Sequence, residues 1–271
     1  MADNRAIGIF DSGLGGLTVA KEIIKLLPNE NIVYFGDTGR VPYGTRSRNT
    51  IKKYALQDER FLLSHNVKLI VAACGTVSSV AADTAEVLPV PFVEVVSHSV
   101  NSAVAATKTK KIGILATAAT INSGAHKSQI LNILPDATVV DCSGTLLVPI
   151  VEEGWTGEND AVALETLRRY LKPIIDADCD TLILGCTHFP VLSGAIRKIL
   201  GENVTLINMG ESTALAVKQM MINSDSLNSG DTPPLHKFFV SDKTSAFSKT
   251  VGILMGDDAE ISIEQADVEN L

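Results

Sequence analysis

The sequence predicts an α/β protein of two pseudo-symmetric lobes, each built on a parallel sheet. Three observations support this fold class. Short runs rich in Ile and Val alternate with segments of helical period, as expected for parallel strands joined by crossover helices. The strand-like runs recur in the same order in the second half of the chain. Each half also carries a cysteine at the end of a buried run, where the chain turns into a helix.

The first half contains four candidate strands with helices between them. Strands are predicted at residues 6–11, 31–35, 67–73 and 92–95. A first helix is expected from Leu17 to Leu27, because Pro28 cannot continue it. The next helix carries apolar residues at helical spacing between Ile51 and Leu62, and a third opens near Thr76.

The second half repeats this order. Residues 111–117 match residues 6–12, residues 138–141 match 32–35, and residues 182–187 match 70–75. Any two α/β chains would show similar strands, but this match also aligns Cys186 with Cys74. We therefore interpret the repeat as two related lobes.

The lobe boundaries are expected near residues 96 and 208. A helix predicted at 99–107 starts the second lobe, which covers 97–208, and the first lobe combines 1–96 with 209–271. The tail is expected to pack on the first lobe. It holds a polar surface loop at 223–234, a strand at 236–240 and a helix at 245–255.

Composition restricts the possible functions. The 271 residues are 45% hydrophobic and carry a net charge of −8, which is typical of a well-buried globular protein and argues against nucleic-acid binding. No apolar run approaches the roughly 18 residues that a membrane span needs. The N-terminus leads directly into a strand and leaves no room for a signal peptide, so a cytoplasmic location is expected.

The four cysteines favour neither a metal site nor disulfides. They are Cys74, Cys142, Cys179 and Cys186. They form no C-x-x-C pair, and no His lies at zinc-finger spacing from them. A reducing cytoplasm would keep the thiols free, so the alternative for any single cysteine is a buried structural role.

Two thiols facing each other across a cleft suit inversion at a carbon atom. Ligands of open α/β sheets bind beyond the carboxyl ends of the strands, where both Cys74 and Cys186 are expected. One thiol can remove a proton from one face and the other can return a proton to the opposite face. A thiol pKa near 8.5 can be lowered by a helix N-terminus or a neighbouring charge. Asp11 is a candidate assistant of Cys74, and His188 of Cys186, the alternative being a helix cap or a satisfied polar group.

A dinucleotide site is the competing interpretation of the first loop. Gly13-x-Gly15-Gly16 follows a strand and opens a helix, and Asp37 ends the next strand. However, Thr18 occupies the third glycine position, and Asp11 would repel a pyrophosphate. This interpretation would also leave the two cysteines without a role.

Six motifs together resemble those of glutamate racemases in the aspartate/glutamate racemase superfamily. They are Phe10-Asp11-Ser12-Gly13-Leu14-Gly15-Gly16, Gly36-Asp37-Thr38, Val41-Pro42-Tyr43-Gly44, Ala73-Cys74-Gly75-Thr76, Val151-Glu152 and Gly185-Cys186-Thr187-His188-Phe189-Pro190. The resemblance implies two lobes with the active site between them and no cofactor. It implies α-proton exchange between Cys74 and Cys186, assisted by Asp11 and His188, with Glu152 as a polar supporting residue.

The same resemblance implies a substrate and a biological setting. The implied substrate-binding residues are Asp11, Ser12, Pro42, Tyr43, Gly44, Cys74, Gly75, Thr76, Cys186, Thr187 and His188. The implied product is D-glutamate for bacterial peptidoglycan, made by a homodimer that binds neither metal, nucleic acid nor membrane. An aspartate or hydantoin substrate, or a non-catalytic binding protein, are the alternatives. The intact cysteines argue against a binding protein.

The chain departs from the family pattern at Gly75, where Asn is usual. The lost side-chain hydrogen bond would cost roughly 0.5–1.5 kcal/mol unless another group replaces it, and Ser78, Ser79 or a water molecule are the candidates. Phe189 replaces the commoner Tyr. Which of Glu152 and Glu153 faces the site stays open. The N-terminus lacks the extension of relatives activated by a cell-wall precursor, so that regulation is not expected.

Overall fold

A computed structural model of the chain describes residues 2–243, 247–256 and 262–268. Its strands are β1 (Ile7–Asp11), β2 (Ile32–Gly36), β3 (Leu69–Ala72), β4 (Phe92–Glu94), β5 (Lys111–Ala116), β6 (Thr138–Ser143), β7 (Thr181–Gly185), β8 (Thr205–Asn208), β9 (His236–Val240) and β10 (Ile263–Gln265). Its helices are α1 (Leu17–Leu26), α2 (Arg48–Ser64), α3 (Gly75–Val80), α4 (Val95–Ala106), α5 (Ala118–Ser123), α6 (Ala125–Ile133), α7 (Leu147–Glu152), α8 (Ala161–Asp176), α9 (Ser193–Leu200), α10 (Met209–Asn223) and α11 (Phe247–Met255).

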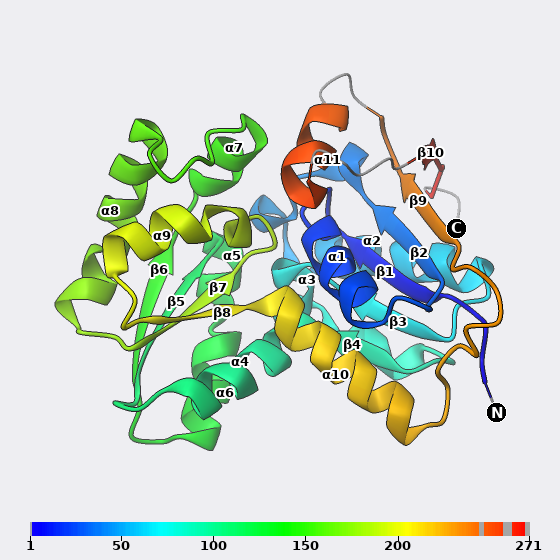
Figure 1. The fold of residues 1–271 in the computed structure, drawn as a ribbon, viewed down its shortest axis with the longest axis horizontal. Helices are drawn as coiled ribbons and strands as arrows, with labels where there is room; N and C mark the ends of the chain where they lie inside the picture. Colours follow the sequence, from blue (N-terminus) through cyan, green and yellow to red (C-terminus); the bar gives the residue numbers. More distant parts are fainter. Residues whose placement is uncertain (1, 244–246, 257–261, 269–271) are drawn as a thin grey trace.

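The strands form two parallel sheets with the same internal order (Figure 1). The first sheet runs β10-β9-β2-β1-β3-β4 and the second β6-β5-β7-β8. Every recorded strand pair is parallel. In each half the first strand lies between the second and third, and the fourth lies beside the third. The predicted α/β fold and its internal repeat are therefore confirmed.

Burial explains why the central strands are almost entirely apolar. All residues of β1, β2, β3 and β7 are buried, because helices cover both faces of a parallel sheet. Asp11 is the one charged residue of β1, and it stands at the carboxyl end. In these four strands the one charged side chain thus stands at a carboxyl end.

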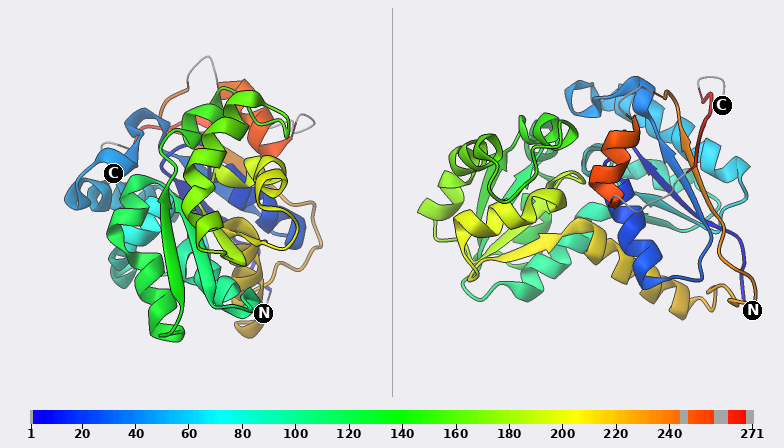
Figure 2. Two further views of the ribbon diagram at one scale, coloured as in Figure 1. Left: turned by 90° about the vertical axis from the view of Figure 1, so that its left-hand side faces the viewer. Right: turned by 45° about the horizontal axis from the view of Figure 1, so that its top comes forward.

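Two equivalent helices, α4 and α10, follow the fourth strand of each sheet. They pack against each other, and α10 also packs against α1 (Figures 1 and 2). The predicted start of the first of these helices at residue 99 is wrong, because the Glu94 carboxylate accepts the backbone N–H groups of Val96 and Ser97 and starts α4 at Val95. The predicted lobe boundaries fall at the starts of α4 and α10, and the division into two domains stays a prediction.

The tail packs on the first half, as predicted, and its strands extend the first sheet. Strand β9 pairs with β2, and β10 pairs with β9. Helix α11 packs against α1, as Figure 2 shows, and also reaches α7 of the other half. There Lys249 Nζ donates a hydrogen bond to the carbonyl of Glu153 at 2.9 Å. Residues 245–246 of the predicted helix lie outside the described residues.

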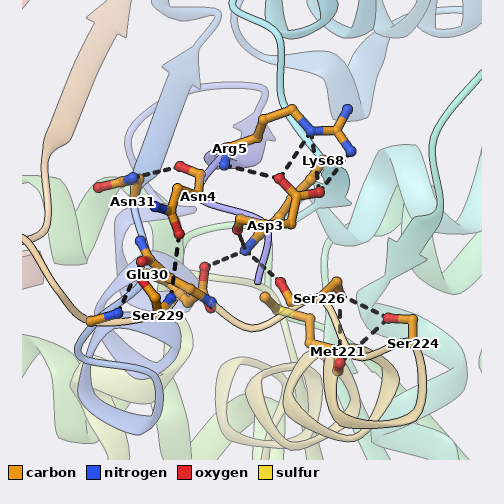
Figure 3. A network of polar contacts seen from close by, with 12 residues as sticks. Asp3, Asn4, Arg5, Glu30, Asn31, Lys68, Met221, Ser224, Ser226 and Ser229 are labelled. Atoms are coloured by element: carbon orange, nitrogen blue, oxygen red, sulfur yellow. Dashed lines mark hydrogen bonds and ion pairs between the residues drawn. The ribbon is translucent and has the colours of Figure 1, made fainter. Parts of the chain in front are cut away.

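A buried ion pair joins the segments at the amino ends of the first sheet's strands (Figure 3). Lys68 Nζ lies 2.6 Å from Glu30 Oε2, and both side chains are 2% exposed. The same ammonium donates to the carbonyls of Asp3 and Ser226, at 2.6 and 2.8 Å. Glu30 also accepts the backbone N–H of Asn228. This network holds the N-terminus and the segment after α10 against the sheet, at the end opposite to the strand tips that carry Asp11 and Cys74.

No helix within the described ranges is long and apolar enough to cross a membrane.

Candidate active site

One cavity of about 420 Å³ lies where the carboxyl ends of the two sheets meet. Its lining comes from the segments after β1, β2, β3, β5, β6 and β7, and from α7. This is the expected place for a ligand in parallel sheets, and the volume suits a small molecule. The lining includes every residue that the sequence predicted for the site: Asp11, Ser12, Pro42, Tyr43, Gly44, Cys74, Gly75, Thr76, Glu152, Cys186, Thr187 and His188.

Cys186 belongs to a chain of polar contacts with His188 and Glu152. Cys186 Sγ lies 3.9 Å from His188 Nδ1, and His188 Nε2 lies 3.2 Å from Glu152 Oε1. Cys186 and His188 are buried, whereas the Glu152 side chain is 51% exposed. Burial alone would lower the pKa of His188, but the hydrogen bonds to Cys186 and Glu152 outweigh it and raise that pKa to about 10. At neutral pH the imidazole is therefore protonated beside the thiol.

Cys74 has a different environment. It is the N-cap residue of α3, and its thiol donates a hydrogen bond to Ser12 Oγ at 3.4 Å. Burial, and then the nearby Asp11 carboxylate, raise the pKa of Cys74 to about 12. The expectation that its surroundings lower the thiol pKa is thus wrong for Cys74, because loss of water and a like charge outweigh the helix N-terminus. At neutral pH Cys74 is a protonated thiol.

The Asp11 carboxylate is held by the loop that follows it. Its Oδ2 accepts the backbone N–H groups of Gly13 at 3.1 Å and Gly16 at 3.0 Å. Burial raises the pKa of Asp11 despite these bonds. Asp11 and Cys74 are both described, yet no hydrogen bond joins their side chains, so Asp11 influences the thiol through its charge, which raises the pKa of Cys74. A pyrophosphate would need the same N–H groups, which further disfavours the dinucleotide interpretation.

A buried polar network supports the cavity wall formed by residues 42–44. The Tyr43 hydroxyl donates to Asp37 and lies 3.0 Å from Asp58 Oδ2. The Arg40 guanidinium lies 2.6 Å from Asp37 and 3.0 Å from Asp58, and both carboxylates are fully buried. The Tyr43 hydroxyl is therefore engaged within this wall of the cavity.

The predicted site did not include several hydroxyl groups that follow strands β5 and β6. Thr117, Thr120 and Thr145 line the cavity. Thr117 Oγ1 lies 3.3 Å from Thr76 Oγ1 of the other half, and it donates to Thr120 Oγ1 at 3.0 Å. The repeat that aligns residues 6–12 with 111–117 pairs Thr117 with Ser12, and that signal could have identified it.

The structure distinguishes the two adjacent glutamates. Glu152 contacts His188 and lines the cavity. Glu153 instead places its carboxylate 3.8 Å from Lys249 Nζ on α11 and is not part of the lining.

Gly75 packs directly against the second sheet. A Cβ at this position would lie only 2.8 Å from the carbonyl oxygen of Gly185. The two serines considered as replacements for the usual Asn amide do not reach the site. The Ser78 hydroxyl bonds to the backbone of β3 and α4, and neither Ser78 nor Ser79 lines the cavity. The prediction that Ser78 or Ser79 substitutes for the amide is therefore wrong, and substitution by a water molecule stays a prediction.

Comparison with known proteins places this geometry in a family. A family profile described as Asp/Glu/Hydantoin racemase matches residues 8–220. The glutamate racemase of Geobacter metallireducens is 42% identical over 265 residues, which cover 96% of this chain and 97% of that protein. The solved glutamate racemase of Francisella tularensis in complex with D-glutamate shows 34% identity and a TM-score of 0.91, covering 99% of this chain and 100% of its own. The Thermus thermophilus glutamate racemase structure shows 37% identity, a TM-score of 0.88 and full coverage of both chains. The chain belongs to the Asp/Glu/hydantoin racemase family.

Proposed function

We propose that this chain interconverts L- and D-glutamate by moving the α-proton between Cys74 and Cys186 without a cofactor. The observation that carries the proposal is that two cysteines from equivalent strand ends of the two sheets line one cavity. Family membership points to racemisation as the reaction. We assign glutamate as the substrate because relatives that are more than 30% identical over nearly the whole chain are named glutamate racemases.

The reaction needs one base and one acid on opposite faces of the α-carbon. The Cys186 thiolate, stabilised by the protonated His188, removes the α-proton that faces it. The electron pair of the broken C–H bond stays on the substrate. The Cys74 thiol then donates its proton to the other face of the same carbon, and the configuration is inverted. After this turnover the two cysteines have exchanged protonation states, so Cys74 is the base for the opposite enantiomer.

His188, Glu152 and Asp11 act on the thiols rather than on the substrate carbon. Glu152 keeps His188 protonated, and the imidazolium places a positive charge 3.9 Å from the Cys186 sulfur. The negative charge of Asp11 opposes ionisation of Cys74 before this thiol donates its proton to the substrate. The two thiols therefore differ in their electrostatic surroundings, with a cation beside Cys186 and a carboxylate near Cys74.

Substrate binding relies on hydroxyl and backbone donors, because the described cavity lining contains no Lys or Arg. Carboxylate oxygens accept hydrogen bonds from such groups. We assign this role to the hydroxyls of Ser12, Thr76 and Thr187 and to the backbone of Gly75. The wall at residues 42–44 contributes shape.

The experiment is incubation of the purified protein with L-glutamate in deuterium oxide. Circular dichroism follows racemisation, and NMR follows replacement of the α-proton by deuterium. L-aspartate and a hydantoin are offered in parallel. We expect loss of optical activity and exchange with glutamate alone. Turnover of aspartate or the hydantoin in place of glutamate would show that glutamate is not the substrate. Binding of glutamate without exchange would identify a binding protein.

We also propose a cytoplasmic homodimer that supplies D-glutamate for peptidoglycan synthesis, with lobes at 1–96 plus 209–271 and at 97–208. These assignments rest on the family resemblance and on the repeated topology. Sedimentation of the purified protein tests the dimer, and growth of a depleted bacterial strain on added D-glutamate tests the biosynthetic role.

A further inference from the structure

A hydroxyl outside the cavity lining joins the two halves of the protein next to the second thiol. Thr18 stands in the first turn of α1 and is 8% exposed. Its Oγ1 lies 2.8 Å from the carbonyl oxygen of Thr187, which is 169 residues away in the sequence. Thr187 is the residue between Cys186 and His188. The contact therefore connects helix α1 of the first half to the turn that carries the thiol and its imidazole.

The hydroxyl has a second possible acceptor, the carbonyl of Gly15 at 2.9 Å. A hydroxyl has one proton, so the two acceptors compete for it. The Gly15 carbonyl already accepts the backbone N–H of Thr18 at 3.0 Å. Within the described part of the chain, the Thr187 carbonyl has no other recorded donor. Because a buried carbonyl without a partner is unfavourable, the Thr18 hydroxyl donates its hydrogen bond to the Thr187 carbonyl.

An independent observation shows how closely the two halves approach here. A Cβ on Gly15 would lie 2.2 Å from Thr187 Oγ1 and 2.5 Å from His188 Nδ1. Only a glycine allows this approach, so the loop before α1 rests directly on the turn of residues 186–188. Since Thr18 is not part of the cavity lining, direct contact with substrate does not account for its hydrogen bond.

We propose that Thr18 is a positioning residue, which holds the turn of residues 186–188 against α1 and thereby keeps Cys186 and His188 in line with Cys74. The proposal rests on the two-thiol function given above. Without the hydroxyl bond, the turn is free to shift relative to the first half. The Cys186–His188 contact, which is already 3.9 Å, would then lengthen, and the thiolate would lose part of its stabilisation.

The test compares Thr18→Val, which keeps the shape and removes the hydroxyl, with Thr18→Ser, which keeps the hydroxyl. Thr213→Val is the matched control, because the buried Thr213 hydroxyl bonds to the Met209 carbonyl within its own helix, α10. We expect Thr18→Val to lower kcat/KM for glutamate about tenfold, since misplacement by roughly 1 Å can cost up to 10²-fold. Thr18→Ser should recover most of this loss, and Thr213→Val should show none.

A second readout needs no turnover and separates positioning from folding. Iodoacetamide labelling without substrate is followed by mass spectrometry across pH for each cysteine. In Thr18→Val the labelling midpoint of Cys186 should move to higher pH, while that of Cys74 in the same molecules stays unchanged. An unshifted Cys186 profile, or equal losses of kcat/KM in the Val and Ser variants, would overturn the proposal. If the unmodified protein fails to racemise glutamate, the proposed function fails, but the labelling comparison still decides the role of Thr18.

Discussion

Restoring a side chain at position 75 tests how tightly the two halves are fitted around the site. Gly75→Asn introduces the residue that the family pattern usually carries, and Gly75→Ala introduces a Cβ alone. In both variants the new Cβ meets the carbonyl oxygen of Gly185 at 2.8 Å. This contact is with backbone, so no side-chain rotation relieves it. The halves must therefore separate slightly at the point where Cys74 and Cys186 approach the substrate.

The size of the effect follows from that distance. The contact is roughly 0.5 Å shorter than the approximately 3.3 Å at which carbon–oxygen contacts begin. Overpacking of this kind costs about 1–3 kcal/mol in the free energy of unfolding. Since a displacement of about 1 Å can cost up to 10²-fold in rate, half that displacement predicts a loss of about tenfold in kcat. We expect Gly75→Asn also to raise KM for glutamate, because its larger side chain enters the cavity.

The assay is circular dichroism of L-glutamate racemisation, with urea unfolding measured on the same samples. Gly157→Ala is the control, because a Cβ at Gly157 meets nothing within 4 Å. It should leave kcat, KM and stability unchanged. A several-fold drop in KM with unchanged kcat for Gly75→Asn would refute the reasoning. It would mean that the site lacks only the amide and has room for it.

Three further variants test the site and the fold. Cys186→Ser should lower kcat by about 10²–10⁴-fold in the dichroism assay, because a serine hydroxyl is too weak an acid to exchange the proton. Glu152→Gln should lower the pKa of His188 from about 10, as followed by NMR of its ring protons. The raised pKa of His188 stabilises the folded protein in full below the ordinary pKa near 6.5, and this contribution is lost as pH rises through about 10. Glu152→Gln should therefore unfold more easily than the unmodified protein only below pH 10. Lys68→Met should destabilise the protein by about 3–5 kcal/mol in urea unfolding, because Glu30 is left buried without its partner.

Each variant has a matched control. Cys142→Ser replaces a buried cysteine of β6 outside the cavity and should keep activity. Glu153→Gln removes the neighbouring carboxylate and should leave the His188 titration unchanged. Adding Glu30→Leu to Lys68→Met should recover much of the lost stability, because no unpaired charge is then buried. Racemisation by Cys186→Ser at near-normal rate, an unchanged His188 titration in Glu152→Gln, or full stability of Lys68→Met would each contradict the corresponding argument.

The site residues were predictable from the sequence to the extent that they follow strands. Cys74 and Cys186 close buried apolar runs, and the carboxyl ends of parallel strands must meet at one edge of a sheet. The protonation of the two thiols was not predictable. It depends on burial and on partners such as Glu152, which reaches His188 from α7, a helix 36 residues earlier in the chain.

The sequence by itself determined the two sheets, their repeated order and the cavity's principal residues, because strand period, helix period and motif order are local properties of the chain. The tertiary structure alone decided where the two halves touch. Two of these contacts join segments that are distant in sequence: the close approach of Gly75 to Gly185 and the Thr18–Thr187 hydrogen bond. Which of Glu152 and Glu153 faces the site also depends on how such segments pack. The hydrophobic pattern of the sequence does not predict such contacts, because they form only when the two folded sheets pack against each other and exclude water between them.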